Sequence, residues 1–495
     1  MKRTTTLIII GIFSIFVILS CAVNPVTGKK QINFMSESQE IATGKESDPA
    51  IIAQFSLYPN DTFQKFINQK GQEMVKVSHR PDLPFQFRLL DSDVLNAFAV
   101  PGGYVYFTRG IMAYFNNEAQ FAGVLGHEIG HVTARHSAQQ YTKQMLSQVA
   151  LVGGMIFSEK LRGMSEQAMQ GMQLLFLKFS RDDETESDKL GVNYSSSIGY
   201  DAKEMADFFN TLGRASGGEE GRVPEFMSTH PDPGNRYVNV KNLAAEWQKQ
   251  KGVTNLKVNR NEYLKMIDGL VYGEDPRQGY LDKTTNIFYQ PEMKFQYPIP
   301  KGWQYQNSPT QVQAGSADGN AMLTLTLSSQ KTLQAAADEI IKGYQLKLLT
   351  QGTSTKINGL DAYHFISQYG EAQTTQQTTS TQQQQVLAVH TTLISFNNNI
   401  YVFLGLTDMK LYDQYKASFV SATNGFKQIT DAKKIDVSPE RIKIVQTNAQ
   451  YTLAQILSQQ DMPTARHEEL AILNGMNTTT VVPAGTLIKV LTRKK

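Results

Sequence analysis

The stretch that most constrains the fold of this chain is Phe121–His136, which reads FAGVLGHEIGHVTARH. Apolar residues recur through it at helical spacing and no proline interrupts it, so it predicts a single helix. His127 and His131 stand one turn apart on that helix, and both imidazoles leave the same face. Gly126 and Gly130 lie beside them and favour close packing against a neighbour. A buried helix that turns polar groups inward needs a partner for those groups.

The pattern predicts one zinc ion per chain as that partner. Two neutral imidazoles and a carboxylate suit zinc, and a catalytic zinc has three protein ligands and one open position. Glu128 lies about 100° round the helix from His127, where its carboxylate can reach a metal-bound water without ligating the metal. It would take a proton from that water and later pass it to a leaving amine. The alternative is a chance motif whose two histidines only pack.

The third ligand must come from another part of the chain. On a continuous helix His136 lies well round from the face of His131, so we interpret it as a structural or supporting histidine. An acidic stretch offers better candidates, because Glu184 and Asp188 are one turn apart on a helix. Glu184 can bind zinc while Asp188 accepts the free N–H of a ligand histidine, and Glu186 points elsewhere. A solvated acidic helix start is the alternative.

A predicted strand, tight turn and strand precede the zinc helix, between Asn96 and Thr108. A strand beside a zinc helix can pair with an extended peptide and present its carbonyl to the metal. The alternative is a plain structural hairpin. The residues predicted to form this substrate strand and its turn are Asn96, Ala97, Gly102 and Gly103.

A rigid loop with two prolines and a glycine, Met227–Arg236, carries another candidate, His230. His230 can donate to the oxyanion of the tetrahedral intermediate, or occupy the open position of zinc in a resting state. The alternative is an ordinary surface histidine. His364 and His390 lie on predicted strands without ligand spacing, and we assign them no chemistry.

The N-terminus predicts secretion and a lipid anchor. Met1–Ser20 has a basic start and an apolar core that is short for a membrane span but suits a secretory leader. Cys21, the only cysteine of the chain, follows directly in a context that resembles a bacterial lipobox. Ala22 after it, rather than aspartate, favours a periplasmic protein anchored to the outer membrane. Residues 21–45 are then a lipidated polar tether.

The chain of 495 residues is long enough for several domains. Its formal charge of +3 is nearly balanced and gives no sign of nucleic-acid binding. The fold class is α+β multidomain: a mainly helical domain with a small sheet over residues 46–250, an α+β domain over 262–430, and a small strand–helix–helix–strand module over 440–495. Residues 145–172 predict a helical hairpin, which either forms a lid or packs in the core. Residues 373–385 predict a disordered loop.

The stretches NPVTG after the cysteine, NAFAVPGGYVYFTRG, HEIGHVTARH, ETESD and STHP together resemble one family. They are similar to the HtpX-like and CAAX-prenyl-endopeptidase gluzincins, in the periplasmic lipoprotein branch that includes BepA-like and LoiP-like proteins. The resemblance covers residues 24 to about 245 and implies a zincin protease. It implies Glu184 as the zinc ligand, Asp188 as the family's aspartate although ESD replaces the commoner EAD, and His230 with Arg236 as its histidine and following arginine.

This resemblance implies protein or peptide substrates, such as misfolded envelope proteins. Residues 262–430 are loosely similar to PsbP/Mog-type domains, and 440–495 weakly resemble a LysM module, which binds glycan. Ala449-Gln450-Tyr451 replaces the expected Gly-Asp, so peptidoglycan binding and docking both remain open. The alternative functions are hydrolysis of peptidoglycan peptides, or a chaperone-like or peptidoglycan-binding scaffold with a quiescent protease site. The intact Glu128 argues against a quiescent site.

Overall fold

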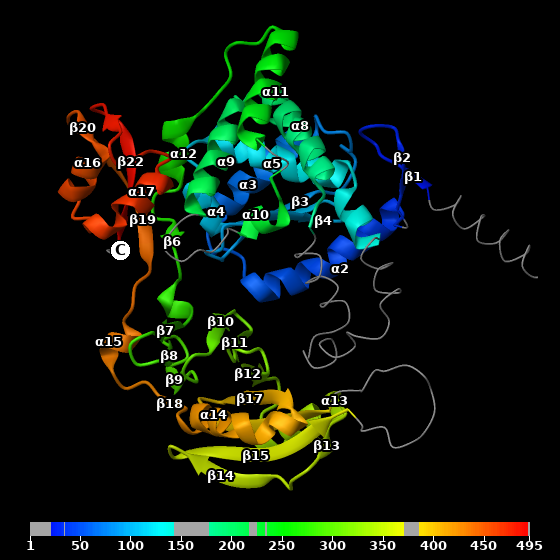
Figure 1. Cartoon of the computed structure of the whole chain (residues 1–495), viewed down its shortest axis with the longest axis vertical. Helices are drawn as coiled ribbons and strands as arrows, with labels where there is room; N and C mark the ends of the chain where they lie inside the picture. The colour runs from blue at the N-terminus through cyan, green and yellow to red at the C-terminus, as the bar shows by residue number, and fades with distance from the viewer. Residues whose placement is uncertain are drawn as a thin grey trace, which may run out of the picture. The chain divides into compact units, whose positions relative to one another are not determined.

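A computed structural model describes residues 21–33, 35–142, 178–216, 225–232, 235–370 and 386–493, and divides them into two compact units (Figure 1). One unit joins the chain up to Gly273 with Glu440–Lys495, and the other is Glu274–Pro439. Helices and several sheets are present, in agreement with the α+β multidomain expectation. The predicted leader and the segments 145–172 and 373–385 lie outside the described residues. In the part described, no helix is long and apolar enough to cross a membrane.

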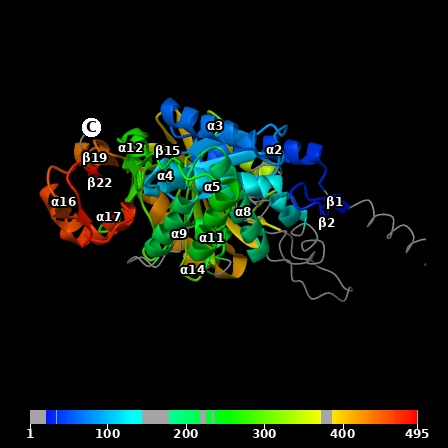
Figure 2. The ribbon, with the colours of Figure 1, turned by 90° about the horizontal axis from the view of Figure 1, so that it is seen from above.

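The first unit is built around α5, every residue of which is buried. The side chain of Asn117 caps its first turn by accepting from the backbone N–H of Gln120. Both views place α8 and α9 beside it (Figures 1 and 2), and α11 packs against α8 and α9. The described helices of this part are α2 (Glu37–Phe55), α3 (Asp61–Val75), α4 (Arg109–Tyr114), α5 (Glu118–Thr133), α8 (Arg181–Ser197), α9 (Lys203–Ala215), α10 (Glu225–Thr229), α11 (Arg236–Lys251) and α12 (Arg260–Met266).

The helix predicted to run to His136 is shorter than expected, since α5 ends at Thr133. Arg135 has φ 64°, a left-handed conformation that interrupts the helix. Arg80 donates to the carbonyl of Val132 at 3.1 Å, so a side chain from another segment satisfies the open helix end. The expectation that His136 continues the same helix is therefore wrong.

The segment predicted as a polar tether, residues 21–45, is largely regular structure. Strands β1 (Cys21–Val23) and β2 (Lys30–Ile32) pair, and α2 begins at Glu37 behind a capping box on Ser36. Buried Glu40 of α2 forms ion pairs with Arg80 at 2.9 Å and with Arg135. These contacts join α2 to the end of α5, and a charged residue that is paired in this way belongs to a folded segment.

A three-stranded sheet of order β3-β5-β4 lies in the same unit. The expected hairpin is present, with β4 at the edge, while the parallel strand β3 was not predicted. Gly102 in the turn has φ +83°, and a Cβ there would lie 2.4 Å from the Glu40 carbonyl, so only glycine fits. The strands are β3 (Gln86–Leu90), β4 (Ala97–Val100) and β5 (Tyr104–Thr108).

The C-terminal segment has the expected strand–helix–helix–strand order, but it packs as part of the first unit rather than as a separate domain (Figures 1 and 2). Strand β19 pairs with both β22 and β6, which precedes the second unit in sequence. Lys489 is buried, and its Nζ donates to the carbonyls of Ala113, Phe115 and Leu473 at 2.7–2.9 Å. The elements are β6 (Val271–Tyr272), β19 (Glu440–Gln446), β20 (Tyr451–Thr452), α16 (Leu453–Gln459), α17 (His467–Leu473), β21 (Val481–Val482) and β22 (Leu487–Thr492).

The second unit begins at Glu274, later than the predicted 262, because α12 and β6 belong to the first unit. Strands β16 (Leu387–Phe396) and β17 (Asn399–Asp408) form a hairpin, turned at Asn397 and Asn398 with φ 49° and 60°. Helix α13 (Leu333–Gly343) lies in the same unit. The main sheet has the order β10-β11-β12-β17-β16-β15-β13, and β14 also pairs with β15.

The elements of the second unit are β7 (Tyr280–Asp282), β8 (Ile287–Gln290), β9 (Phe295–Pro298), β10 (Gln304–Asn307), β11 (Gln311–Gly315), β12 (Ala321–Ser328), α13 (Leu333–Gly343), β13 (Lys347–Leu348), β14 (Thr353–Ile357), β15 (Leu360–Tyr369), β16 (Leu387–Phe396), β17 (Asn399–Asp408), α14 (Tyr412–Asn424), β18 (Lys427–Gln428) and α15 (Ala432–Ile435).

Candidate metal centre

Close packing of α5 against α8 creates the site. A Cβ on Gly126 would lie 2.9 Å from the carbonyl of Gly191, and one on Gly130 would lie 3.1 Å from Cβ of Leu190. A larger residue at Gly126 would push the helices apart. The capping box of Ser180 starts α8, so its first turns, which carry the acidic residues, face the end of α5.

Four buried side chains converge where these helices meet, and one ligand atom of each lies within 4.8 Å of the others. The Nε2 atoms of His127 and His131 are 3.0 Å apart, and His230 Nδ1 is 3.3 Å from His127 Nε2. Glu184 Oε1 is 3.3 Å from His131 Nε2 and 3.0 Å from His230 Nδ1. With zinc–nitrogen bonds of about 2.0–2.1 Å, tetrahedral ligand atoms stand roughly 3.3 Å apart, so this donor set fits zinc.

The charge states of the cluster also suit a cation. Burial lowers the pKa of His127 and of His131, which favours the neutral imidazoles that bind metal. Burial alone would raise the pKa of Glu184, but the imidazoles of His230 and His127 and hydrogen bonds from His131 and His230 hold it well below its usual value. A buried carboxylate beside the neutral imidazoles of His127 and His131 is the chemistry that zinc prefers.

Glu128 lies beside the cluster without belonging to it. Both of its carboxylate oxygens are buried and have no hydrogen-bond partner, and Oε1 is 3.7 Å from Nε2 of His230. Burial raises the pKa of Glu128 to about 7. A buried carboxylate without hydrogen bonds costs stability, and such groups concentrate at sites that do chemistry.

Asp188 and Arg236 support the cluster from behind. Asp188 Oδ1 is 2.9 Å from His127 Nδ1, so the ring can donate its N–H to the carboxylate while Nε2 stays free. Arg236 donates to both oxygens of Asp188, at 2.6 and 2.8 Å, and its guanidinium lies 3.9 Å from the ring of Phe209. These fixed groups hold the His127 ring in one orientation.

Two aromatic rings that were not predicted to act here stack on the histidines. Phe179 lies 3.9 Å from the ring centre of His131, and Phe226 lies 4.4 Å from that of His230. The backbone N–H of His230 donates to the Phe226 carbonyl at 2.8 Å, which ties this histidine to α10. Neither phenylalanine has a spacing that marks a site, because stacking across helices depends on tertiary packing.

The predicted substrate strand lies near α5 but contributes no atom to the four-residue cluster. Asn96 is buried, and its Oδ1 has no hydrogen-bond partner, while Ala97, Gly102 and Gly103 are buried in β4 and its turn. The carbonyl of Ala99 accepts from Ser137 at 3.0 Å. Peptide binding by this strand stays a prediction.

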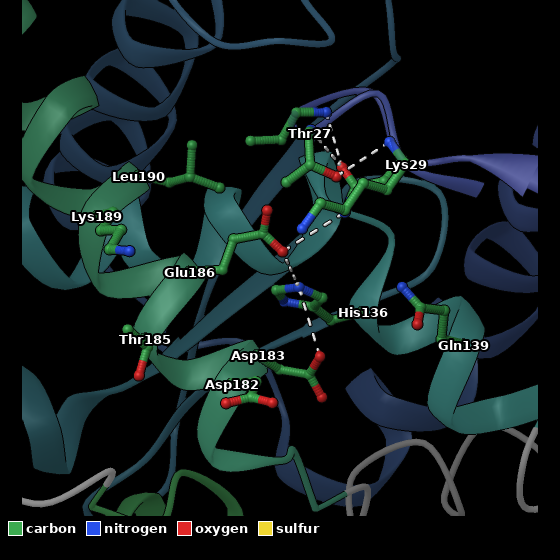
Figure 3. A pocket seen from close by; sticks show the side chains of 12 residues that line it. Thr27, Lys29, His136, Gln139, Asp182, Asp183, Thr185, Glu186, Lys189 and Leu190 are labelled. Atoms are coloured by element: carbon green, nitrogen blue, oxygen red, sulfur yellow. Dashed lines mark hydrogen bonds and ion pairs between the residues drawn. The ribbon is translucent and has the colours of Figure 1, made fainter. Parts of the chain in front are cut away.

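His136 and Glu186 face a pocket of about 550 Å³ next to the cluster (Figure 3). Nε2 of His136 is 3.0 Å from Oε2 of Glu186. Glu186 points away from the four converging side chains, as expected from its place on α8. Lipidation of Cys21 stays a prediction.

Residues 62–244 match the sequence profile of Peptidase family M48. The beta-barrel assembly-enhancing protease of Yersinia pestis is 30% identical over 219 residues, which is 42% of this chain and 45% of that protein. The mitochondrial metalloendopeptidase OMA1 of Arabidopsis thaliana is 29% identical over 170 residues, 34% of this chain and 33% of that protein. The chain thus spans less than half the length of these two relatives.

The solution structure of cyanobacterial PsbP from Synechocystis sp. PCC 6803 has a TM-score of 0.21 and 15% identity, covering 30% of this chain and 91% of that one. The PsbP-like interpretation of residues 262–430 stays a prediction.

The converging histidines and carboxylate, with the profile match, define a zinc metalloendopeptidase domain. Residues 62–244, which carry these four side chains, are the part of the chain that matches the profile of Peptidase family M48. The finer assignment to a periplasmic lipoprotein branch stays a prediction.

Proposed function

We propose that the protein is a zinc-dependent endopeptidase that hydrolyses peptide bonds of envelope proteins. The observation that carries this proposal is Glu128, buried and without a hydrogen-bond partner beside four converging ligand atoms. His127, His131 and Glu184 would hold the zinc, while Asp188 and Arg236 would orient His127. When bound, zinc acidifies water and polarises the substrate carbonyl.

Glu128 is the general base and acid of the proposed reaction. Its raised pKa, about 7, lets the carboxylate accept a proton near neutral pH and release it to the leaving amine. Its position on α5, one residue after His127, keeps it beside the cluster without making it a ligand. A general base needs such a place within reach of the attacking water.

His230 is proposed to gate the site. Its Nδ1 stands among the ligand atoms, 3.0 Å from Glu184 Oε1, which supports a resting state in which it fills the open position of the metal. Its Nε2 faces Glu128, so once displaced from the metal the same ring could donate to an oxyanion. Substrate would then enter by moving α10 and the loop after it.

The substrate class and location follow from similarity. The relative from Yersinia pestis is a beta-barrel assembly-enhancing protease by name, which supports misfolded or stalled envelope proteins as substrates here. Cys21 would carry the lipid that anchors the protein to the outer membrane from the periplasmic side. An extended substrate would pair with the edge strand β4.

The C-terminal segment is proposed to dock on the peptidase rather than to bind peptidoglycan. Arg214 of α9 pairs with Glu468 at 3.0 Å, and Lys489 is held by carbonyls on α4 and after it. The buried contacts of Lys489 support a structural role. Incubating the full chain with isolated cell wall tests this proposal: retention on the wall that needs residues 440–495 would favour glycan binding instead.

Zinc content and casein cleavage of the purified chain, measured beside Glu128→Gln, test the proposed function. We expect one zinc ion per chain in both proteins and about 10²–10⁴-fold slower cleavage in the variant, because the general base is lost. The glutamine side chain is nearly isosteric with glutamate, so the variant should keep the fold of the parent protein. Equal cleavage by the two proteins would rule out this mechanism.

A further inference from the structure

The ring of His131 has a second nitrogen that faces away from the cluster. Its Nδ1 is 3.1 Å from Nδ1 of His136, and both rings are buried. In a continuous helix these two residues would point roughly 140° apart. The left-handed conformation of Arg135 ends α5 between them and brings His136 back against His131.

Hydrogen-bond direction along this contact follows from metal binding. If His131 binds through Nε2, its hydrogen must be on Nδ1, and Nδ1 of His136 must accept it. The hydrogen of His136 is then on Nε2, which lies 3.0 Å from Oε2 of Glu186 and 3.7 Å from Oδ1 of Asp183 (Figure 3). The hydroxyl of Ser187, whose Oγ is 3.2 Å from Nδ1 of His136, can also donate to that nitrogen.

We propose that His136 and Glu186 are positioning residues for the metal: they form a relay that fixes His131 in the tautomer with a free Nε2 and makes that nitrogen a better ligand. This rests on the ligand set of the proposed function. The two ligand histidines then have equivalent support, since Asp188 contacts His127 directly and Glu186 acts on His131 through His136.

The relay ends in the pocket that the N-terminal loop helps to line. Glu186 has 23% of its side chain exposed there, and Nδ2 of Asn24 lies 3.5 Å from its Oε2. Thr27 and Lys29 of the same loop lie at the rim (Figure 3). Part of the Glu186 side chain is therefore in contact with solvent, while the other members of the relay are buried.

The test compares His136→Leu with His136→Gln in the full chain. Leucine fills the space without an acceptor, whereas the glutamine amide oxygen can accept the hydrogen of His131. We expect leucine to weaken zinc binding about 10–100-fold in competition with a chromophoric chelator. Glutamine should restore most of that affinity, and the visible spectrum of the cobalt-substituted protein should change only with leucine.

Glu186→Ala should produce a smaller loss of zinc affinity. In this variant Nδ1 of His136 can still accept the hydrogen of His131, but the His136 ring is no longer held in one orientation. Asp182→Asn is the matched control: it removes an exposed carboxylate that lines the same pocket, and zinc affinity should not change. Thermal unfolding of the zinc-free proteins reports any general loss of packing.

Wild-type affinity and an unchanged cobalt spectrum in His136→Leu would overturn the relay. So would equal losses in the leucine and glutamine variants together with a lower unfolding temperature of both zinc-free proteins, which would indicate packing alone. Failure of the proposed function looks different, because the wild-type chain would then bind no zinc.

Discussion

Each unit contains a pair of neighbouring histidines with nearly the same separation, both buried in the first unit and one buried, one half-buried in the second. The ring centres of His127 and His131 are 4.6 Å apart in the first unit, and those of His364 and His390 are 4.5 Å apart in the second. The first pair lies on one helix and the second on neighbouring strands. Ring separation alone therefore does not distinguish a metal site from ordinary packing.

The surroundings distinguish them. In the first pair both Nε2 atoms face each other and the carboxylate of Glu184. In the second, Nδ1 of His364 faces the carbonyl of Thr391 at 2.9 Å, and Nδ1 of His390 faces the hydroxyl of Tyr412 at 2.8 Å. Among the described residues, only the cluster in the first unit groups three or more ligand atoms. Converging nitrogens and a carboxylate, rather than two rings, define the site.

The largest expected effect is the loss of zinc when a histidine of the first pair is replaced, compared with no loss when a histidine of the second pair is replaced. His127→Ala should lower zinc content from one ion per chain towards none and abolish cleavage, since only His131 and Glu184 of the three proposed permanent ligands remain beside the displaceable His230. His390→Ala is the matched control and should retain both zinc and cleavage. Metal analysis after gel filtration measures the difference. Loss of zinc in both variants would mean that the second pair contributes to binding.

Asp188→Asn should weaken zinc binding about 10–100-fold. The amide can still accept from His127, but the negative charge that favours the ligand tautomer is lost, and buried Arg236 loses the closer of its two carboxylate partners. Chelator competition measures the affinity, and unfolding of the zinc-free protein corrects for stability. Unchanged zinc affinity would show that the negative charge of Asp188 next to His127 is not what distinguishes the first histidine pair from the second.

His230→Ala should leave zinc bound and raise casein cleavage several-fold, because the resting fourth ligand is removed. The measurement is the steady-state rate at saturating casein. A fall in kcat of about 10²–10³-fold would instead identify His230 as a donor to the oxyanion.

Local rules predicted the parts of the site that lie on single helices. Spacing of one turn put His127 with His131 and Glu184 with Asp188, and the buried environment of α5 followed from its glycines and apolar residues. The approach of α8 and of His230 to α5 required the family pattern, because no local rule states which helices pack together.

Several features depended on long-range contacts that a sequence does not display. Arg135 has a left-handed backbone conformation, which an arginine does not indicate in a sequence as a glycine does. This conformation nevertheless places His136 behind the metal site. The carbonyls that hold Lys489 come from segments more than 370 residues away and from α17. In contrast, the Asn397-Asn398 turn had a readable signal, since asparagine favours the left-handed turn of a hairpin.

The pair of His364 and His390 in the second unit should make the stability of that unit depend on pH, and it should not affect zinc binding. Burial, with a smaller contribution from His364, lowers the pKa of His390 to about 3. The unfolded chain binds that proton near pH 6.5, so unfolding is favoured as the pH falls from about 6.5 towards 3. Between pH 7 and 5 this amounts to about 2 kcal/mol.

Urea unfolding of the second unit at the two pH values measures this loss, and His390→Gln should reduce it by about that amount. Trp303 packs in the second unit, and replacing the other tryptophan, Trp247→Phe, makes its fluorescence a specific reporter. Variant and parent that lose equal stability would show that His390 titrates alike in folded and unfolded chains. The comparison of the pairs would then need another explanation, because a histidine that protonates freely is not held neutral by its surroundings.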